Sequence, residues 1–351
     1  MNKVRTDEEL YVAVTLGTMP GNETIHRQVA EFGIQEAAMH WLAGDGPPAF
    51  CERWGKVVTF APKVLESGRR RGFRFIIPAN DEWPTELGVL DELAPLALWV
   101  KGNGNLAELS KLAISIVGAR SSTSYGERIA STMASHAAGI GVTVVSGAAF
   151  GIDASAHRGA LANNGPTMAV LACGVDVAYP RSHDTLLARI ADSGVVISEH
   201  APGQPPRKPG FLIRNRLIAA LGQSTVVVEA AMRSGTLSTS TWANDIGKKV
   251  WGVPGQITSP TSAGVHVGIA QGTMSVLVDI KDPFSLMAPR IPLGQTEHVV
   301  LALVLNESLT TDDVVHRLRN ETRSSDAIAA LALLEFSGLI VRQADYWVRA
   351  S

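Results

Sequence analysis

Residues 113–153, AISIVGARSSTSYGERIASTMASHAAGIGVTVVSGAAFGID, decide the fold of this chain. An apolar run ends in a glycine turn, a stretch long enough for a helix follows, and a second apolar run ends in a second glycine-rich turn. Strands that are apolar at nearly every position are typical of parallel sheets buried on both faces. The stretch therefore predicts a strand–helix–strand unit of a parallel α/β sheet.

The same alternation continues to about residue 280. Further strands are expected at residues 168–173, 195–198, 225–228, 249–253 and 275–280. Helices are expected between them, near residues 125–138, 153–162, 183–192, 211–221, 237–246 and 264–270. We therefore predict an α/β fold with a doubly wound, Rossmann-like parallel sheet.

The two ends of the chain follow other patterns. Short helices are expected at residues 8–16, 23–32 and 34–42, followed by a strand in 72–78. The tail predicts helices at 297–305, 311–318 and 325–336 and a hairpin of 339–342 with 346–349, an order typical of a winged-helix-like domain. Residues 326–336 are mostly apolar and contain no Lys or Arg, which favours a docking or regulatory role over DNA reading.

These patterns predict the domain organisation. The expected parts are a small helical N-terminal domain (1–71), a Rossmann-like DNA-binding domain (72–284, with 72–104 as its lead-in segment), a linker (285–294) and a C-terminal winged-helix-like domain (295–351).

Composition excludes several classes of protein. Hydrophobic residues make up 46% of the 351 residues, so a large core is expected and disorder throughout is excluded. The two cysteines, Cys51 and Cys173, lie far apart, which excludes a disulfide framework and a clustered-cysteine metal site. The sequence contains no long apolar run, and its start turns acidic before any apolar segment. We expect a cytoplasmic protein that has no membrane partner.

The net charge of −2 hides a local asymmetry. Residues 200–249 contain seven Lys and Arg but only two Asp and Glu. Such a stretch suits a face that binds a polyanion, although a solvated surface is equally consistent with charge alone.

Three loops follow predicted strands, at the edge where open α/β sheets bind ligands. In the first loop, Gly118 permits a turn and Arg120 is a candidate phosphate clamp. The second and third loops each open a helix, where backbone N–H groups attract anions. Their candidate residues are Ser146, Gly147, Gly151, Ser234, Gly235 and Thr236. Asp153 is expected to cap the helix of the second loop, and His157 to be packed.

The basic stretch PPRKPGFLIRNR at residues 205–216 adds an aromatic ring. Lys208 is expected on an exposed loop, and Arg214 and Arg216 at the start of the next helix. Cations with Phe211 between them suit single-stranded nucleic acid, because phosphates follow a basic groove and bases stack on rings. A core position for Phe211 remains the alternative.

An enzymatic site is not apparent in the sequence. It contains no Gly-x-Ser-x-Gly elbow, no Walker phosphate loop and no His-Glu-x-x-His helix. Glu199 and Glu229 end predicted strands, where a carboxylate acts in acid–base catalysis or holds a loop. We expect no catalytic residues, no metal and no cofactor.

Motifs spread over residues 72–275 resemble one known family. They include IVGAR at 116–120, VSGAAFGID at 145–153, AVLACGVD at 169–176, RNR at 214–216, VEAA at 228–231, SGT at 234–236 and VPG at 253–255. Together they are similar to the DNA-processing protein A (DprA/Smf) family, bacterial recombination mediators of natural transformation. The resemblance implies a homodimer that binds and protects incoming single-stranded DNA and loads a RecA-type recombinase.

The resemblance also implies site residues. Arg120, Lys208, Phe211 and Asn215 match positions that contact DNA in the family. Ala119 stands where the family usually has Ser, and Gly268 where it usually has Leu in a segment associated with dimer packing. The candidate single-strand site comprises Gly118, Arg120, Ser146, Gly147, Gly151, Lys208, Phe211, Arg214, Asn215, Arg216, Ser234, Gly235 and Thr236.

Two enzyme classes are the alternatives. Nucleotide phosphoribohydrolases with a similar fold carry a catalytic glutamate where this chain has Thr239, which disfavours hydrolysis. A nicotinamide-dependent oxidoreductase needs a Gly-x-Gly-x-x-Gly loop after the first strand, and residues 118–123 do not supply it.

Overall fold

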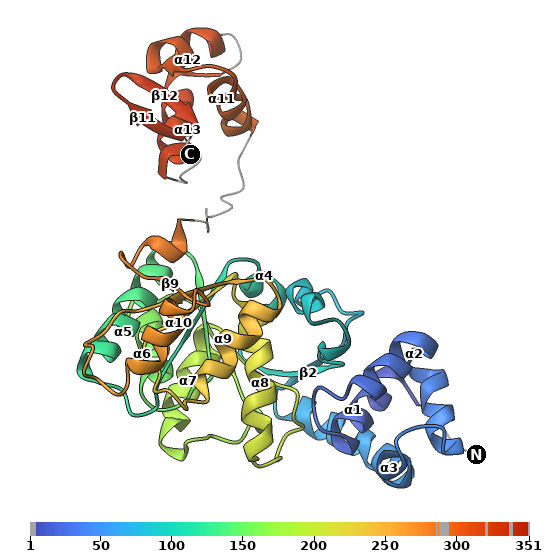
Figure 1. Cartoon of the computed structure of the whole chain (residues 1–351). Coiled ribbons are helices and arrows are strands. Elements are labelled where there is room, and N and C mark those ends of the chain that lie inside the picture. The colour runs from blue at the N-terminus through green and yellow to red at the C-terminus, as the bar shows by residue number, and fades with distance from the viewer. Residues whose placement is uncertain (1–4, 286, 288–294, 320–321, 337–339, 350–351) are drawn as a thin grey trace. The chain divides into compact units, whose positions relative to one another are not determined.

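The computed structural model describes residues 5–285, 287, 295–319, 322–336 and 340–349 (Figure 1). Contacts within the chain divide it into two compact units, Met1–Ile280 and Lys281–Ser351, and each is described by itself. Among the described residues, no helix is both long enough and apolar enough to cross a bilayer.

The first unit contains a nine-stranded sheet in the order β1-β2-β6-β5-β4-β3-β7-β8-β9. The strands from β6 to β9 in this order run parallel, and β1 and β2 join one edge antiparallel. The bounds are β1 Arg74–Ile76, β2 Leu98–Lys101, β3 Ala113–Val117, β4 Thr143–Ser146, β5 Thr167–Val170, β6 Val195–Ser198, β7 Ser224–Val227, β8 Lys249–Gly252 and β9 Ser275–Val276. The mostly parallel sheet confirms the predicted fold class.

Helices cover both faces of this sheet (Figure 1). They are α4 Leu106–Lys111, α5 Ser124–Gly139, α6 Ile152–Ala162, α7 Asp184–Ser193, α8 Lys208–Leu221, α9 Thr236–Asp245 and α10 Ala263–Ala270, with 3-10 helices η1 Thr85–Leu93 and η2 Arg181–His183. Neighbouring residues of β5 enter different core clusters: Met168 packs with the residues of α8 and α9, and Ala169 with those of α6 and α7. The alternation of side chains along buried strands therefore divides the helices into two layers.

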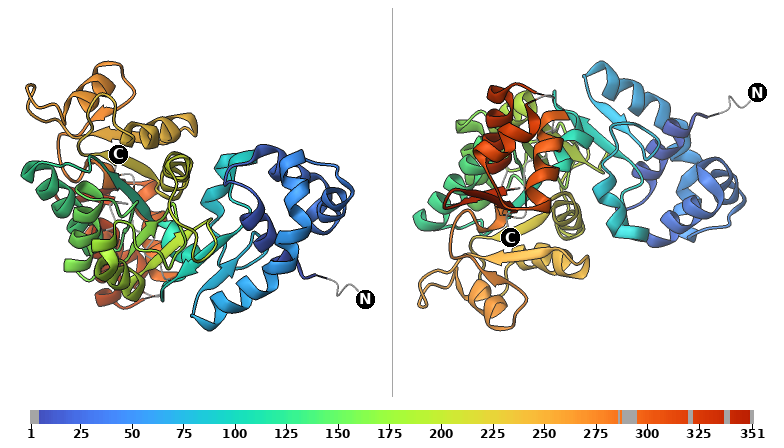
Figure 2. Two further views of the ribbon diagram at one scale, coloured as in Figure 1. Left: turned by 90° about the horizontal axis from the view of Figure 1, so that it is seen from below. Right: turned by 90° about the horizontal axis from the view of Figure 1, so that it is seen from above.

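Three helices precede the sheet: α1 Asp7–Gly17, α2 Glu23–Ala43 and α3 Pro48–Arg70. Both views in Figure 2 show these blue helices at one end of the unit, beside the cyan segment that contains β1 and β2. The two short helices predicted at 23–32 and 34–42 are the halves of α2, which is interrupted at Gly33, where φ is +74°. On the sheet side, a Cβ at Gly68 of α3 would lie 2.3 Å from the Trp99 ring of β2, so only glycine permits this close approach.

Helix α3 is absent from the sequence prediction. It contains Gly55 and, in its interior, Pro62, a residue that usually breaks a helix. Its buried residues nevertheless recur at helical spacing, at positions 50, 54, 61, 65 and 68. The apolar stripe therefore outweighs the local signal of the proline.

The second unit is a small α/β structure. It contains η3 Asp282–Phe284, α11 Gln295–Asn306, β10 Leu309–Thr310, α12 Thr311–Leu318, α13 Ser324–Phe336, β11 Ile340–Gln343 and β12 Tyr346–Arg349. The strands form an antiparallel sheet in the order β10-β12-β11 around a core that includes Val304, Leu331 and Trp347. The interpretation as a winged-helix-like domain and the predicted domain boundaries stay predictions.

A buried ion pair joins three segments of the first unit. Arg216 of α8 is fully buried, and its two terminal nitrogens donate to the two carboxylate oxygens of Glu199, at 2.7 and 2.6 Å. Its Nε donates to the carbonyl of Leu93 at the end of η1, at 2.7 Å. The guanidinium therefore connects α8 to the residue after β6 and to the segment that leads into β2.

We expect Arg216→Met to lower the free energy of unfolding by about 3–5 kcal/mol, because it leaves the Glu199 carboxylate buried without its partner. Urea denaturation measures this change. The control is Arg70→Met, which removes an exposed partner of Glu66 within α3 and should change stability little. Equal small losses in the two variants would contradict the role given to the buried pair.

Candidate nucleic-acid interface

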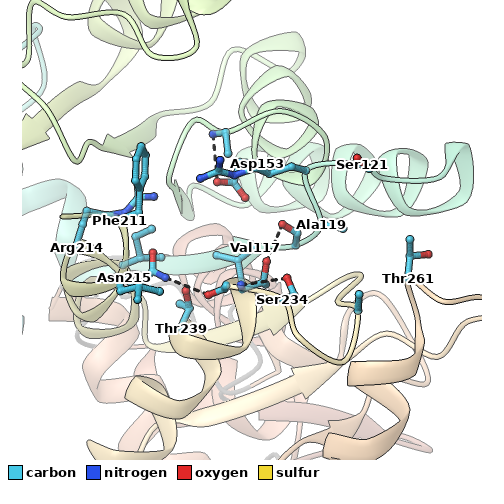
Figure 3. A pocket seen from close by; sticks show the side chains of 18 residues that line it. Val117, Ala119, Ser121, Asp153, Phe211, Arg214, Asn215, Ser234, Thr239 and Thr261 are labelled. Atoms are coloured by element: carbon cyan, nitrogen blue, oxygen red, sulfur yellow. Dashed lines mark hydrogen bonds between the residues drawn. The ribbon is translucent and has the colours of Figure 1, made fainter. Parts of the chain in front are cut away.

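A pocket of about 370 Å³ opens where the sheet changes its direction of growth. Strand β3 has β4 on one side and β7 on the other, so the loops that follow β3 and β7 diverge and leave a crevice. Figure 3 shows this pocket, with Phe211 and Asn215 of α8 on the opposite side of the view from Thr261. Its walls come from the loops after β3, β4 and β7 and from α8.

Hydrogen bonds between the loops fix the floor of the pocket. The N–H of Ala119 donates to the carbonyl of Glu229 at 2.7 Å, and the hydroxyl of Thr236 donates to the carbonyl of Gly118 at 2.9 Å. The buried Glu229 carboxylate accepts from the N–H of Thr123 at 2.9 Å and from its hydroxyl at 2.5 Å. Glu229 therefore holds a loop, which is one of the two roles that the sequence left open for it. Glu199, the other carboxylate that follows a strand, is bound to Arg216.

Phe211 and Arg120 form the rim. The Phe211 ring is partly exposed, the Arg120 guanidinium lies 5.1 Å from its centroid, and the Tyr179 ring lies 5.3 Å away. Arg120 is itself exposed. The ring thus belongs to the wall of an open pocket and contacts a cation, so it is not enclosed in the core.

Arg214 lies beneath this rim and is almost fully buried. One terminal nitrogen donates to the carbonyl of Gly147 at 3.0 Å and to the carbonyl of Val170. Burial lowers the pKa of Arg214 to about 10. The side chain therefore ties the loop after β4 to β5 and contributes its charge to the pocket from below.

The loop after β4 differs from the prediction at Asp153. Gly151, at φ +73°, occupies the N-cap position of α6, and Asp153 lies two residues later. Its buried carboxylate accepts from the N–H of Ala149 at 3.3 Å, so it shapes the loop rather than capping the helix. Burial raises the pKa of Asp153, and the positive charge of Arg214 opposes that rise. His157 is buried and packed, as predicted, with Nδ1 2.7 Å from the hydroxyl oxygen of Thr167.

The structure brings most of the candidate residues together. Those that line the pocket are Gly118, Arg120, Phe211, Arg214, Asn215, Ser234, Gly235 and Thr236. Asn215 also donates from Nδ2 to the carbonyl of Gly235 at 3.3 Å, which connects α8 to the start of α9. The anion nest is smaller than predicted, because the N–H of Thr236 donates to the Ser234 hydroxyl at 3.2 Å and the Thr236 hydroxyl is also engaged.

Other candidates lie outside this pocket. Ser146 is fully buried and donates to the carbonyl of Ile116 at 2.6 Å, and Gly147 lines a neighbouring cavity. Lys208 is exposed at the first residue of α8. Gly151 lies at the N-cap of α6, where a Cβ would lie 2.4 Å from the carbonyl oxygen of Ala119 in the loop after β3.

The prediction that Arg216 contacts DNA is wrong for this geometry, because its guanidinium is fully buried and bound to Glu199. The seven Lys and Arg of residues 200–249 therefore do not all lie on one surface. Lys248 donates to carbonyls at the end of α8, and the Lys249 ammonium lies 4.0 Å from the Trp251 ring centroid. Charges that are close in sequence were counted together although the fold sends them to different places.

Sequence reasoning also missed residues of the site. Thr261 and Ala149 line the pocket, and the buried Thr239 forms part of its wall. The only sequence signal for Ala149 was its place in the glycine-rich loop, and Thr261 had none. Within the part of the chain that the structure describes, no group of three or more His, Cys, Asp or Glu side chains is arranged to hold a metal ion.

Comparison with known proteins agrees with this arrangement. The sequence profile described as DNA recombination-mediator protein A matches residues 74–288. The chain belongs to this family. A DNA processing protein DprA of Mycobacterium tuberculosis is 45% identical over 306 residues, which cover 81% of this chain and 78% of that protein. The Escherichia coli protein Smf is 39% identical over 63% of this chain and 60% of its own length.

Two solved structures of DNA processing protein A are similar to the structure of this chain. That of Streptococcus pneumoniae superposes with a TM-score of 0.69 at 30% identity and covers 81% of this chain and 99% of its own. That of Helicobacter pylori, described as having a unique single-stranded DNA binding mode, gives a TM-score of 0.54 at 27% identity over 60% of this chain and 94% of its own.

Gly147→Ala tests the packing beneath the pocket. A Cβ at this position would lie 2.5 Å from Nη1 of Arg214, so the substitution should push the guanidinium away and lower stability by about 1–3 kcal/mol. The control is Gly235→Ala, where a Cβ meets no atom within 4 Å of the described structure. Denaturant titration of both variants gives the comparison. A Gly147→Ala protein as stable as the Gly235→Ala protein would show that Arg214 does not fix this loop.

Proposed function

We propose that this chain binds single-stranded DNA in the pocket at the carboxyl ends of β3 and β7. The observation that carries the proposal is the partly exposed Phe211 ring with the Arg120 guanidinium over it, at the mouth of a pocket. A base stacks on an aromatic face whatever its sequence, and an adjacent cation neutralises its phosphate. The site is therefore suited to strands of any sequence.

The form of the pocket favours a single strand over a duplex. Phe211 lines the wall of a concavity rather than projecting from a convex surface. A base inside a duplex is covered on both faces by its neighbours, so it reaches such a ring only after it is unstacked. The energy of unstacking disfavours a duplex, and a single strand has little of this cost.

The proposed contacts divide the candidate residues by role. We assign direct contact with the strand to Gly118, Arg120, Lys208, Phe211, Asn215, Ser234 and Gly235. Support comes from their position in the pocket wall or, for Lys208, from its exposure at the start of α8. We assign support of the loops to Ser146, Gly147, Gly151, Arg214 and Thr236, which bond or pack beneath the surface.

We further propose that the chain works in the cytoplasm as a homodimer, protects incoming strands and loads a RecA-type recombinase during DNA uptake. Two findings support this assignment: the description of its family as recombination mediators, and the single-stranded DNA binding mode described for the Helicobacter pylori protein. Action by binding rather than by catalysis is supported by the carboxylates of Glu199 and Glu229, which are both committed to structural bonds.

The proposal predicts a salt-dependent preference for single strands that depends on Arg120. Anisotropy titration of the full chain with an oligothymidylate and with a duplex of equal length, at several salt concentrations, measures it. The natural chain should prefer the single strand. Arg120→Glu should weaken binding and reduce the slope of log K against log salt by about one, because one phosphate contact is lost.

Arg189→Glu is the matched control, since Arg189 is exposed on α7 and lines neither cavity. It should leave the preference and the slope nearly unchanged. Equal affinity of the natural chain for both forms of DNA, or identical slopes for the two variants, would overturn the proposal.

A further inference from the structure

A second cavity, of about 550 Å³, adjoins the pocket at the carboxyl ends of β3 and β7. The two cavities share four lining residues: Arg120, Ala149, Phe211 and Arg214. They are therefore neighbours on one surface, separated by the rim that Phe211 and Arg120 form. Anything that leaves the first pocket across this rim enters the second cavity.

Aromatic side chains line the second cavity, and two of them are exposed. Phe150 is 49% exposed and Tyr179 41%, although both are large apolar side chains. The Phe150 ring is held edge-on against the ring of His183, with centroids 4.9 Å apart, and the Tyr179 ring is inclined by 46° to that of Phe211. Packing thus orients these rings and leaves part of each uncovered.

The charged side chains that line this cavity are all positive. Its lining includes Arg120, Arg181 and Arg214, and none of its described lining residues is Asp or Glu. Arg181, at the start of η2, is exposed. Exposed rings among cations fit a base with its phosphate, whereas an apolar peptide would gain nothing from three guanidinium groups.

We propose that the second cavity is a second base subsite, in which Phe150 and Tyr179 receive the nucleotide next to the one stacked on Phe211. The inference rests on the proposed single-strand function. It adds that the strand crosses the Phe211–Arg120 rim, with one base on each side of it. Arg181 then lies beside the phosphate of the second nucleotide.

The test uses the full chain, an oligothymidylate and a strand of the same length in which every second nucleotide is abasic. The alternating strand keeps its phosphates but never offers two adjacent bases. Phe150→Ala should weaken binding of the oligothymidylate by about 5- to 150-fold, the range for one stacked base. Binding of the alternating strand should change by less than about twofold, because it occupies only one subsite through a base.

Two controls accompany this variant. Phe60→Ala removes a comparably exposed ring, 58% exposed on α3, and should leave both affinities unchanged. Phe150→Tyr keeps the ring and should retain the affinity of the natural chain. Melting temperatures of all variants establish that they are folded.

The outcomes separate the two proposals. Failure of the natural chain to bind the oligothymidylate overturns the proposed function itself. Binding that depends on Arg120 but is unchanged in Phe150→Ala, or weakened equally on both strands, leaves that function standing and overturns the second subsite.

Discussion

The reversal of sheet growth at β3 is the constraint on which the rest of the structure depends. Strands β4, β5 and β6 extend the sheet from one side of β3, and β7, β8 and β9 from the other. The loops after β3 and β7 must separate at this point, and α8, which leads into β7, supplies one wall of the gap. The pocket is thus a consequence of chain topology, and its chemistry comes from the few side chains placed there.

Helix α8 turns this topology into a specific surface. Its two buried arginines are two residues apart and anchor it in different directions: Arg214 holds the loop after β4, and Arg216 holds Glu199 and the end of η1. Phe211 and Asn215 are four residues apart, on one helical face, and both line the pocket. Both guanidinium groups donate to backbone carbonyls of other elements, and a shift of the helix would break these buried bonds. The ring of Phe211 is consequently presented in a fixed place.

Sequence patterns predicted the sheet well because burial on both faces makes each parallel strand a short apolar run, as in residues 113–117 and 195–198. They failed where tertiary packing outweighs a local signal, as in α3 with its interior Pro62. The site was predicted in part: glycine loops indicated where the backbone approaches a ligand, but the list of candidate residues gave Arg216 the same weight as Arg120. Only the fold shows that one guanidinium is fully buried in an ion pair and the other is exposed at the rim. Phe150 was passed over because an isolated aromatic residue in a loop has no periodicity to reveal its exposure.

The central claim is that the Phe211 ring serves binding rather than folding. Measuring the melting temperature and the single-strand affinity on one preparation of Phe211→Ala tests it most directly, with Phe60→Ala, an exposed phenylalanine on α3 that lines neither cavity, as the reference. The account predicts a loss of about 1–3 kcal/mol in binding free energy and a melting temperature close to that of the natural chain. A loss of about 3–5 kcal/mol in folding stability, the cost of truncating a core phenylalanine, or an unchanged affinity would contradict it.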